Sequence, residues 1–107
     1  MKAVRVHEFG GPEVLQYEDA PDPSPGPGQA LVRLHAAGVN FADYLMRRGV
    51  YHGEQPPLTL GIEGAGTVEA VGQGVSWPNV GDRVFGWILQ SYAELSAVDA
   101  ARLMPLP

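Results

Sequence analysis

The sequence predicts a mainly β domain, a small and partly open β-barrel with one or two short helices. Short stretches of alternating polar and apolar residues recur along the 107 residues, and 10 prolines and 14 glycines separate them. Only residues 41–48 carry both a start and a stop signal for an α-helix. A chain of this length makes one domain, which we expect to hold a single core.

The elements before the helix are three predicted strands, at residues 2–7, 14–18 and 31–35. Between the second and third, the prolines and glycines of 21–28 predict a stiff loop that fits neither a helix nor a strand ladder. In the third strand, the odd-numbered residues share one face and the even-numbered residues the other.

The helix signals surround residues 41–48. Asn40 is a favourable N-cap, Asp43 stands at the third helical position near the positive end of the helix dipole, and Gly49 is a natural C-terminal stop. An irregular loop is expected at 51–57 because glycine and two prolines break both periodicities.

The stretch 57–86 organises the rest of the chain. Five glycines lie within 61–74, yet residues 67–71 alternate as a strand with Val68 on one face. Glycine inside a strand marks a bend, a bulge or a close approach of another backbone. These glycines are therefore expected to bend a strand pair around one buried-looking carboxylate, Glu63, rather than to hold phosphates.

The remaining elements are shorter. A turn is predicted at 72–79, strands at 83–87 and 92–96, and one helical turn at 99–102. No repeat accompanies them.

Composition excludes several classes of function. The residues are 45% hydrophobic and 18% charged, with a net charge of −5, and Arg47–Arg48 is the only adjacent basic pair. This balance predicts no nucleic-acid partner and no anionic membrane partner. The absence of cysteine, of an apolar signal core and of any apolar run near the roughly 20 residues of a membrane span predicts a cytoplasmic protein.

Six blocks in the right order carry a family resemblance. Together they are similar to the N-terminal GroES-like catalytic domain of the medium-chain dehydrogenase/reductase superfamily, and within it to the zinc-free quinone oxidoreductases, the zeta-crystallin-like branch. The resemblance covers essentially the whole chain. The blocks are Gly38-Val-Asn-Phe-Ala-Asp43, Arg48-Gly-Val-Tyr51, Gly61-Ile-Glu-Gly64, Val68-Glu-Ala-Val-Gly72, Gly81-Asp-Arg-Val84 and Ser91-Tyr-Ala-Glu94.

The resemblance implies the substrate-side domain of an NADPH-dependent quinone or enone oxidoreductase that works by zinc-free hydride transfer. Its substrate cleft would lie between this domain and a nucleotide-binding domain, with Asn40 and Tyr51 as the catalytic candidates. The other residues that the resemblance brings to the cleft are Phe41, Asp43, Tyr44, Ile62 and Glu63.

Each candidate also has a plainer interpretation. The Asn40 amide suits a carbonyl oxygen on which charge develops, or it is only the N-cap. Tyr51 orients a substrate oxygen or packs on the barrel. Many relatives place a tyrosine where this chain has Leu45, so Tyr44 points about 100° away around the helix.

Two further carboxylates are ambiguous. Glu63 could lie under the cofactor cleft with a raised pKa, but a structural role as acceptor of backbone amides from the glycine bends is favoured. For Asp82 and Arg83, a turn cap or an ion pair is favoured over catalysis.

The zinc question follows from the residues and the resemblance together. Zinc alcohol dehydrogenases place a cysteine at the Asn40 position and a histidine at the Ile62 position, and a catalytic zinc needs about three converging ligands. His7, His35 and His52 lie in separate predicted elements, where ordinary structural or surface roles are expected. A metal-free site is therefore predicted.

A dinucleotide site needs a strand, a glycine-rich turn and a helix, and no such unit exists in the sequence. Gly64-Ala-Gly66 leads into a strand and is not a phosphate loop. The resemblance places the nucleotide-binding Rossmann domain after Pro107, so residues 1–107 alone are expected to be inactive. Two classes stay open: a domain of an enzyme that acts on a quinone or enone, and a stand-alone β-barrel binding module. Self-association into a homo-oligomer is compatible with both.

Overall fold

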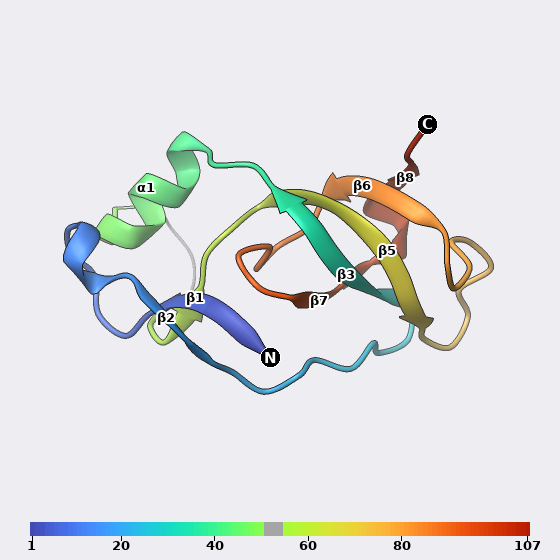
Figure 1. The fold of residues 1–107 in the computed structure, drawn as a ribbon, viewed down its shortest axis with the longest axis horizontal. Helices are drawn as coiled ribbons and strands as arrows, with labels where there is room; N and C mark the ends of the chain where they lie inside the picture. The colour runs from blue at the N-terminus through green and yellow to red at the C-terminus, as the bar shows by residue number, and fades with distance from the viewer. Residues whose placement is uncertain (51–54) are drawn as a thin grey trace.

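Two antiparallel sheets form the described part of the chain, residues 1–50 and 55–107 of a computed structural model (Figure 1). The smaller sheet has the strand order β2-β1-β4, and the larger has the order β7-β3-β5-β6-β8. The strands are β1 (Lys2–Val6), β2 (Gln16–Asp19), β3 (Gln29–Ala37), β4 (Leu58–Thr59), β5 (Glu63–Val71), β6 (Arg83–Trp87), β7 (Leu95–Asp99) and β8 (Leu103–Pro105).

The helices are few and short. One α-helix, α1 (Phe41–Arg48), lies beside the smaller sheet at one end of the molecule (Figure 1), and there are two 3-10 turns, η1 (Pro12–Val14) and η2 (Ala100–Arg102), in the described residues. This mainly β architecture confirms the predicted fold class. None of these helices is long and apolar enough to cross a membrane.

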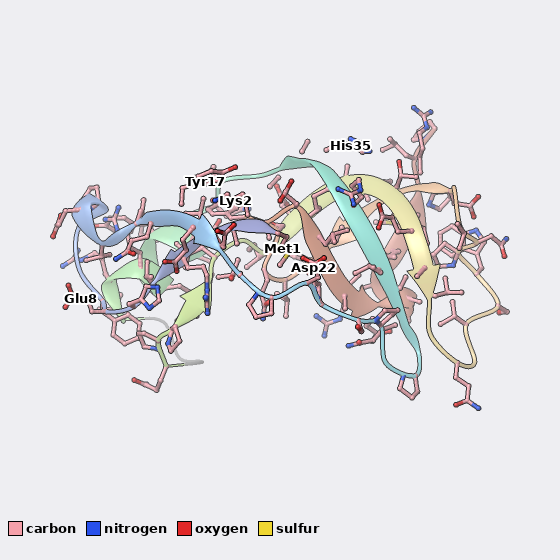
Figure 2. All side chains as sticks on the ribbon, turned by 60° about the horizontal axis from the view of Figure 1, so that its bottom comes forward. Met1, Lys2, Glu8, Tyr17, Asp22 and His35 are labelled. Atoms are coloured by element: carbon pink, nitrogen blue, oxygen red, sulfur yellow. The ribbon has the colours of Figure 1, made fainter. Side chains whose placement is uncertain are left out.

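Several predicted elements are confirmed. α1 has the predicted bounds, β6 lies at 83–87, and a 3-10 turn occupies 100–102. In β3 the even-numbered Val32 is fully buried, while the odd-numbered Arg33 and His35 are exposed, so the two predicted faces of the strand differ in burial. Figure 2 shows His35 at the outer surface of the larger sheet.

Two predicted strands are wrong in position. The strand expected at 14–18 starts only at Gln16, because Pro12 begins a 3-10 turn that ends at Val14. The strand expected at 92–96 pairs with β3 only from Leu95 onward. Tyr92 instead joins the smaller sheet, since its carbonyl accepts from Val4 N–H at 2.7 Å and its N–H donates to Leu60 at 3.0 Å.

The loop that precedes β3 is fastened at its start. The Met1 ammonium group binds Asp22 at 2.8 Å and the Ala20 carbonyl at 3.0 Å. Figure 2 shows Met1 and Asp22 near one another along this loop, which contains neither helix nor strand from residue 20 to 28, as predicted.

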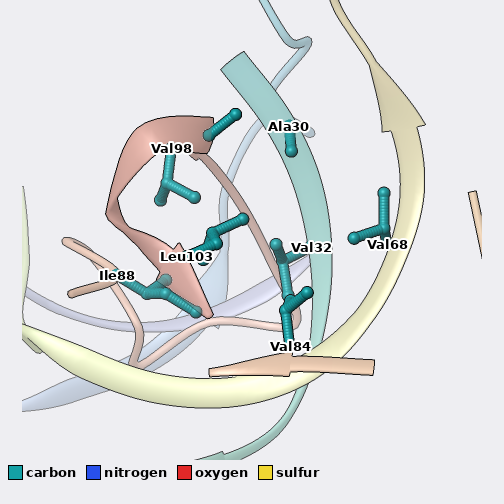
Figure 3. Close-up of a cluster of buried hydrophobic side chains, with 8 residues drawn as sticks. Ala30, Val32, Val68, Val84, Ile88, Val98 and Leu103 are labelled. Atoms are coloured by element: carbon teal, nitrogen blue, oxygen red, sulfur yellow. The ribbon is translucent and has the colours of Figure 1, made fainter. Parts of the chain in front are cut away.

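The single core that we expected is divided into two clusters, one for each sheet. The first lies within the larger sheet and its connections (Figure 3). The second lies between the smaller sheet and α1, where Met46 and Tyr92 cover it. Each sheet buries one face on its own cluster. Tyr92 lies where these two halves of the molecule meet. The first cluster comprises Ala30, Val32, Val68, Val84, Ile88, Val98, Ala100 and Leu103, and the second Val6, Val14, Leu58 and Leu60.

The glycines of β5 allow strands to approach closely. Gly66 pairs with Leu34 on one side and Val84 on the other. A Cβ at Gly66 would collide with the Arg33 carbonyl. Gly64 and Gly66 therefore lie in a three-strand ladder, where the sequence predicted a strand pair, and close approach of a neighbouring backbone explains the glycine at position 66.

Candidate functional site

The site begins at the N-terminus of α1. The backbone at Asn40 is extended, with φ −118° and ψ 160°, and the helix starts at Phe41. The Asp43 carboxylate accepts a hydrogen bond from Asn40 N–H at 2.9 Å, and Asp43 N–H donates to the Asn40 carbonyl at 3.0 Å. The helix ends at Gly49, whose φ of 79° lies in the left-handed region, as its stop signal predicts.

Asp43 is the buried carboxylate of this region, with 4% of its surface exposed. Besides Asn40 N–H, it accepts from Gly61 N–H at 3.0 Å and from the Tyr92 hydroxyl at 3.0 Å. Hydrogen bonds from three segments thus stabilise a charge that would be costly to bury alone. The Asp43 carboxylate joins α1 to the approach to β5 and to Tyr92, and its place in the substrate cleft stays a prediction.

Tyr92 is a hydrogen-bond donor at all ordinary pH values. Burial, together with the hydrogen bond to the Asp43 carboxylate, raises the pKa of the Tyr92 hydroxyl to about 12. Its ring packs on the second hydrophobic cluster. Tyr92 is therefore both a core residue and a fixed partner of Asp43.

A groove of about 600 Å³ opens beside the start of β5. Glu63 supplies the only ionisable side chain among its described lining residues, and Phe85 and Trp87 of β6 form an aromatic wall. A Cβ at Gly38 would collide with the Glu63 side chain, so the backbone before α1 comes close to this carboxylate. The lining residues are Ala36, Ala37, Gly38, Glu63, Gly64, Ala65, Phe85, Gly86, Trp87 and Met104.

Glu63 does not have the structural role that the sequence favoured. It is only partly buried, and no backbone amide of the described residues donates to its carboxylate. Asp43 has that role. Glu63 is left as a carboxylate that faces the groove.

Phe41 and Tyr44 form an aromatic pair on α1. Their ring centroids are 5.5 Å apart, and Phe41 is 72% exposed. Arg48 donates to the Tyr44 hydroxyl at 2.8 Å, and the Arg47 guanidinium lies 5.1 Å from the Tyr44 ring centre. Tyr44 is thus oriented by the last turn of its own helix.

The remaining predicted site residues are Ile62, Asn40 and Tyr51. Ile62 is partly buried, and its carbonyl accepts from Ile88 N–H at 3.0 Å next to Glu63. Within the described residues, the side-chain nitrogen of Asn40 is buried and has no hydrogen-bond partner. Tyr51 lies outside the described residues. The structure therefore joins Asn40 to Asp43 directly. Of the predicted site residues that the structure describes, Glu63 is the one that lines the groove.

The residues outside the site have ordinary partners. His7 binds Glu18 at 2.5 Å, and His35 lies 3.2 Å from the Thr67 hydroxyl. His52 is not among the described residues, and within the rest no group of three or more metal-ligating side chains is found. Asp82 accepts from Asn79 N–H at 2.9 Å, which confirms the predicted turn cap.

Sequence reasoning missed Tyr92, Phe85 and Trp87. Alternation in 83–87 does contain a signal, because it places Phe85 and Trp87 on the face opposite the buried Val84. Trp87 is 54% exposed, which is unusual for so large an apolar side chain at a strand end. No local pattern indicates the Tyr92 contact, since its partner lies 49 residues away.

Comparison with known proteins gives consistent matches. Residues 26–107 match the alcohol dehydrogenase GroES-like domain family. The quinone oxidoreductase of Pseudomonas aeruginosa is 44% identical over 108 residues, which cover 99% of this chain and 33% of the relative.

Solved structures agree over the whole chain. Escherichia coli quinone oxidoreductase complexed with NADPH is 35% identical with a TM-score of 0.95, covering 100% of this chain and 33% of that one. Mycobacterial Rv1454c complexed with NADPH is 42% identical with a TM-score of 0.94, covering 100% and 34%. The chain thus spans about a third of the length of these proteins.

Proposed function

The chain belongs to the alcohol dehydrogenase GroES-like domain family, and from this premise we propose that it is the substrate-side domain of an NADPH-dependent quinone or enone oxidoreductase. One observation carries the proposal. All of the chain superimposes, with a TM-score of 0.95, on a third of a quinone oxidoreductase whose structure contains NADPH.

The described residues do not fit the phosphates of a dinucleotide. A pyrophosphate needs clustered free N–H groups at a glycine-rich turn before a helix. Here Gly64 and Gly66 lie in β5, which pairs with β3 and with β6. The groove offers the phosphates only the Glu63 carboxylate, which repels them. A nucleotide-binding domain is therefore the partner that holds the cofactor in this proposal.

NADPH bound by that partner would supply the hydride. The contribution of this chain is to receive the substrate and to orient its carbonyl group. The groove suits a flat ring, because small alanine and glycine residues line it together with the aromatic side chains of Phe85 and Trp87. Glu63 at its edge disfavours anionic substrates, which is compatible with an uncharged quinone or enone.

Asn40 is the proposed hydrogen-bond donor to the substrate carbonyl. Its amide stands at the N-terminal end of α1, where the helix dipole favours negative charge on an oxygen. Its side-chain nitrogen is buried and has no partner among the described residues, so an unused donor is present beside the helix terminus. Tyr51 is proposed as a second donor on the substrate oxygen.

Hydrogen bonds replace a metal in this scheme. Asn40 and Ile62 stand where zinc alcohol dehydrogenases carry a cysteine and a histidine, and neither the isoleucine side chain nor a neutral amide is a typical zinc ligand. A substrate carbonyl would then be polarised by donors and by the helix terminus rather than by a Lewis acid.

A domain replacement tests the proposal. The 107 residues are substituted for the matching third of the Pseudomonas aeruginosa quinone oxidoreductase, which is 44% identical. We expect this chimera to oxidise NADPH when duroquinone is added, whereas the 107 residues alone show no turnover. Duroquinone is chosen because all its ring carbons are substituted, so it does not alkylate the protein.

Two controls make the result decisive. The chimera carrying Asn40→Ala should lose activity about 10- to 100-fold, since it lacks the donor to the developing oxyanion. The exposed Gln73→Ala serves as the neutral comparison. A folded chimera that binds NADPH but reduces neither duroquinone nor an enone would refute the enzymatic role and favour the binding module.

A further inference from the structure

We propose that Asp43 and Tyr92 form a positioning pair that fixes the backbone of Asn40 relative to the segment after Gly61, which carries Glu63 into the groove. The inference rests on the proposed function, because it concerns the orientation of the Asn40 amide toward a substrate carbonyl. Neither Asp43 nor Tyr92 lines the groove. Both act through the residues that they hold.

The first step is the arrangement of donors around one carboxylate. Asp43 accepts from Asn40 N–H at 2.9 Å, from Gly61 N–H at 3.0 Å and from the Tyr92 hydroxyl at 3.0 Å. The first donor belongs to the proposed catalytic residue itself. The second comes directly before Ile62 and Glu63 in the chain. One side chain thus sets the distance between the two parts of the proposed site.

The second step is that the partners of Asp43 are themselves packed closely against other parts of the backbone. Gly61 has φ 107°, and a Cβ there would lie 2.7 Å from Ser91 N and 2.8 Å from Tyr92 N. Tyr92 is held by its backbone, which bonds to Val4 and Leu60 of the smaller sheet region. The carboxylate is therefore attached to a rigid frame, and Asn40 is fixed by that frame rather than by α1 alone.

The third step concerns protonation. The Tyr92 hydroxyl must stay protonated to be one of the three donors to the Asp43 carboxylate. This condition holds near neutral pH, because burial and the hydrogen bond to Asp43 raise the pKa of Tyr92 to about 12. The Tyr92 donor is therefore present under working conditions.

Misplacement of a substrate-orienting group mainly lowers the rate of the chemical step, because the substrate still binds but is badly aligned. In the chimera, we expect Tyr92→Phe to lower kcat about 3- to 10-fold and Asp43→Asn about 10- to 100-fold, with KM for duroquinone within about 2-fold of the parent. The phenylalanine keeps the ring that covers the second cluster, so this variant should fold even if Asp43→Asn does not.

Asp82→Asn is the matched control. Asp82 accepts from the N–H three residues earlier at 2.9 Å, the same local bond that Asp43 makes to Asn40, but at a turn away from the groove. This variant should leave both kcat and KM unchanged. Equal kcat in Tyr92→Phe, Asp43→Asn and the parent would overturn the positioning role.

Amide exchange in the 107-residue chain supplies a readout that does not need turnover. Asp43→Asn and Tyr92→Phe should speed hydrogen exchange at Asn40 N–H and Gly61 N–H together, by about 10-fold or more, whereas Asp82→Asn should affect only Asn79 N–H. Unchanged exchange at Asn40 and Gly61 would overturn the proposal. An inactive parent chimera would instead refute the proposed function, while the exchange result still decides whether Asp43 and Tyr92 hold Asn40.

Discussion

Asp43 and Asp82 make the same local hydrogen bond in very different surroundings. Each carboxylate accepts from the backbone N–H three residues earlier at 2.9 Å, Asn40 in one case and Asn79 in the other. Asp43 is 4% exposed and has two further donors from distant segments. Asp82 lies in a surface turn between β5 and β6, and no donor other than Asn79 is found for its side chain in the described residues.

The difference shows how a local cap becomes part of a tertiary frame. A carboxylate at the third position from a cap residue satisfies one free N–H wherever it occurs. Only burial makes additional donors necessary, because an ionised group without water must be compensated by protein groups. At Asp43 those donors come from Gly61 and Tyr92, so the same motif that ends a turn at Asp82 organises a site at Asp43.

The largest expected difference in the free energy of unfolding is between the variants that remove the Asp43 and the Asp82 carboxylate. Asp43→Ala leaves a buried donor on Gly61 and partly buried donors on Asn40 and Tyr92 without an acceptor, and an unsatisfied buried donor costs about 1–3 kcal/mol. The free energy of unfolding should therefore fall by about 3 kcal/mol or more. Asp82→Ala loses one exposed cap, worth about 0.5–2 kcal/mol.

Urea unfolding of both variants at pH 7 provides the measurement. The midpoint should fall far more for Asp43→Ala, with a similar slope in both variants. Equal losses would mean that Gly61 and Tyr92 find other acceptors, and the distinction between the two carboxylates would then disappear.

The glycines beside the two carboxylates extend the comparison. Gly61 and Gly81 both have positive φ, at 107° and 94°, so an added side chain is strained at either position. Only at Gly61 would the new Cβ meet backbone atoms, whereas at Gly81 nothing lies within 4 Å. Gly81→Ala should cost about 1–2 kcal/mol, and Gly61→Ala should add about 1–3 kcal/mol to that from the collision.

Thermal unfolding of the two alanine variants distinguishes these contributions. A pair of equally destabilised variants would indicate that Ser91 and Tyr92 can move away from position 61, contrary to the rigid frame that the contacts describe. The larger loss at Gly61 would confirm close approach as the reason for that glycine.

The sequence predicts local features of this region well and long-range ones poorly. Asn40, Asp43 and Gly49 define both ends of α1 because capping depends on residues a few positions apart. The alternation in 31–35 likewise separates the two faces of β3, and the structure shows that the face with Val32 is the one that packs in a core.

The errors arise where one segment serves two sheets. Residues 92–94 pair with the smaller sheet before β7 joins the larger one, and a strand pattern does not say which partner a strand takes. Glycine neighbours likewise made Glu63 look like the buried carboxylate. The choice of Asp43 depends on the Tyr92 contact across 49 residues, which no local pattern contains.

Removing a single hydroxyl should have a smaller effect than removing a carboxylate. Tyr92→Phe keeps the ring in the second cluster but removes one hydrogen bond to a charged acceptor, so we expect a loss of about 1–3 kcal/mol in the free energy of unfolding. Tyr44→Phe removes an exposed contact with Arg48 and should change stability by less than about 0.5 kcal/mol.

Chemical denaturation of these two variants at pH 7 compares a partly buried hydroxyl donor, on Tyr92, with an exposed hydroxyl acceptor, on Tyr44. If Tyr44→Phe costs as much as Tyr92→Phe, the stacked pair on α1 contributes more to the fold than its exposure suggests.

The effect most specific to Asp43 is a dependence of stability on alkaline pH. A free tyrosine loses its proton near pH 10, but the pKa of Tyr92 in the folded chain is about 12. Between these values the folded chain binds more protons than the unfolded chain, so the free energy of unfolding must fall as pH rises. The contribution of Tyr92 is complete below pH 10 and is lost as pH rises through about 12. Denaturation midpoints of the parent and of Tyr92→Phe should therefore converge over this range, while ultraviolet titration should show one tyrosine ionising later than the rest. A constant difference between the two midpoints from pH 9 to pH 12 would mean that the Tyr92 hydroxyl does not donate to Asp43.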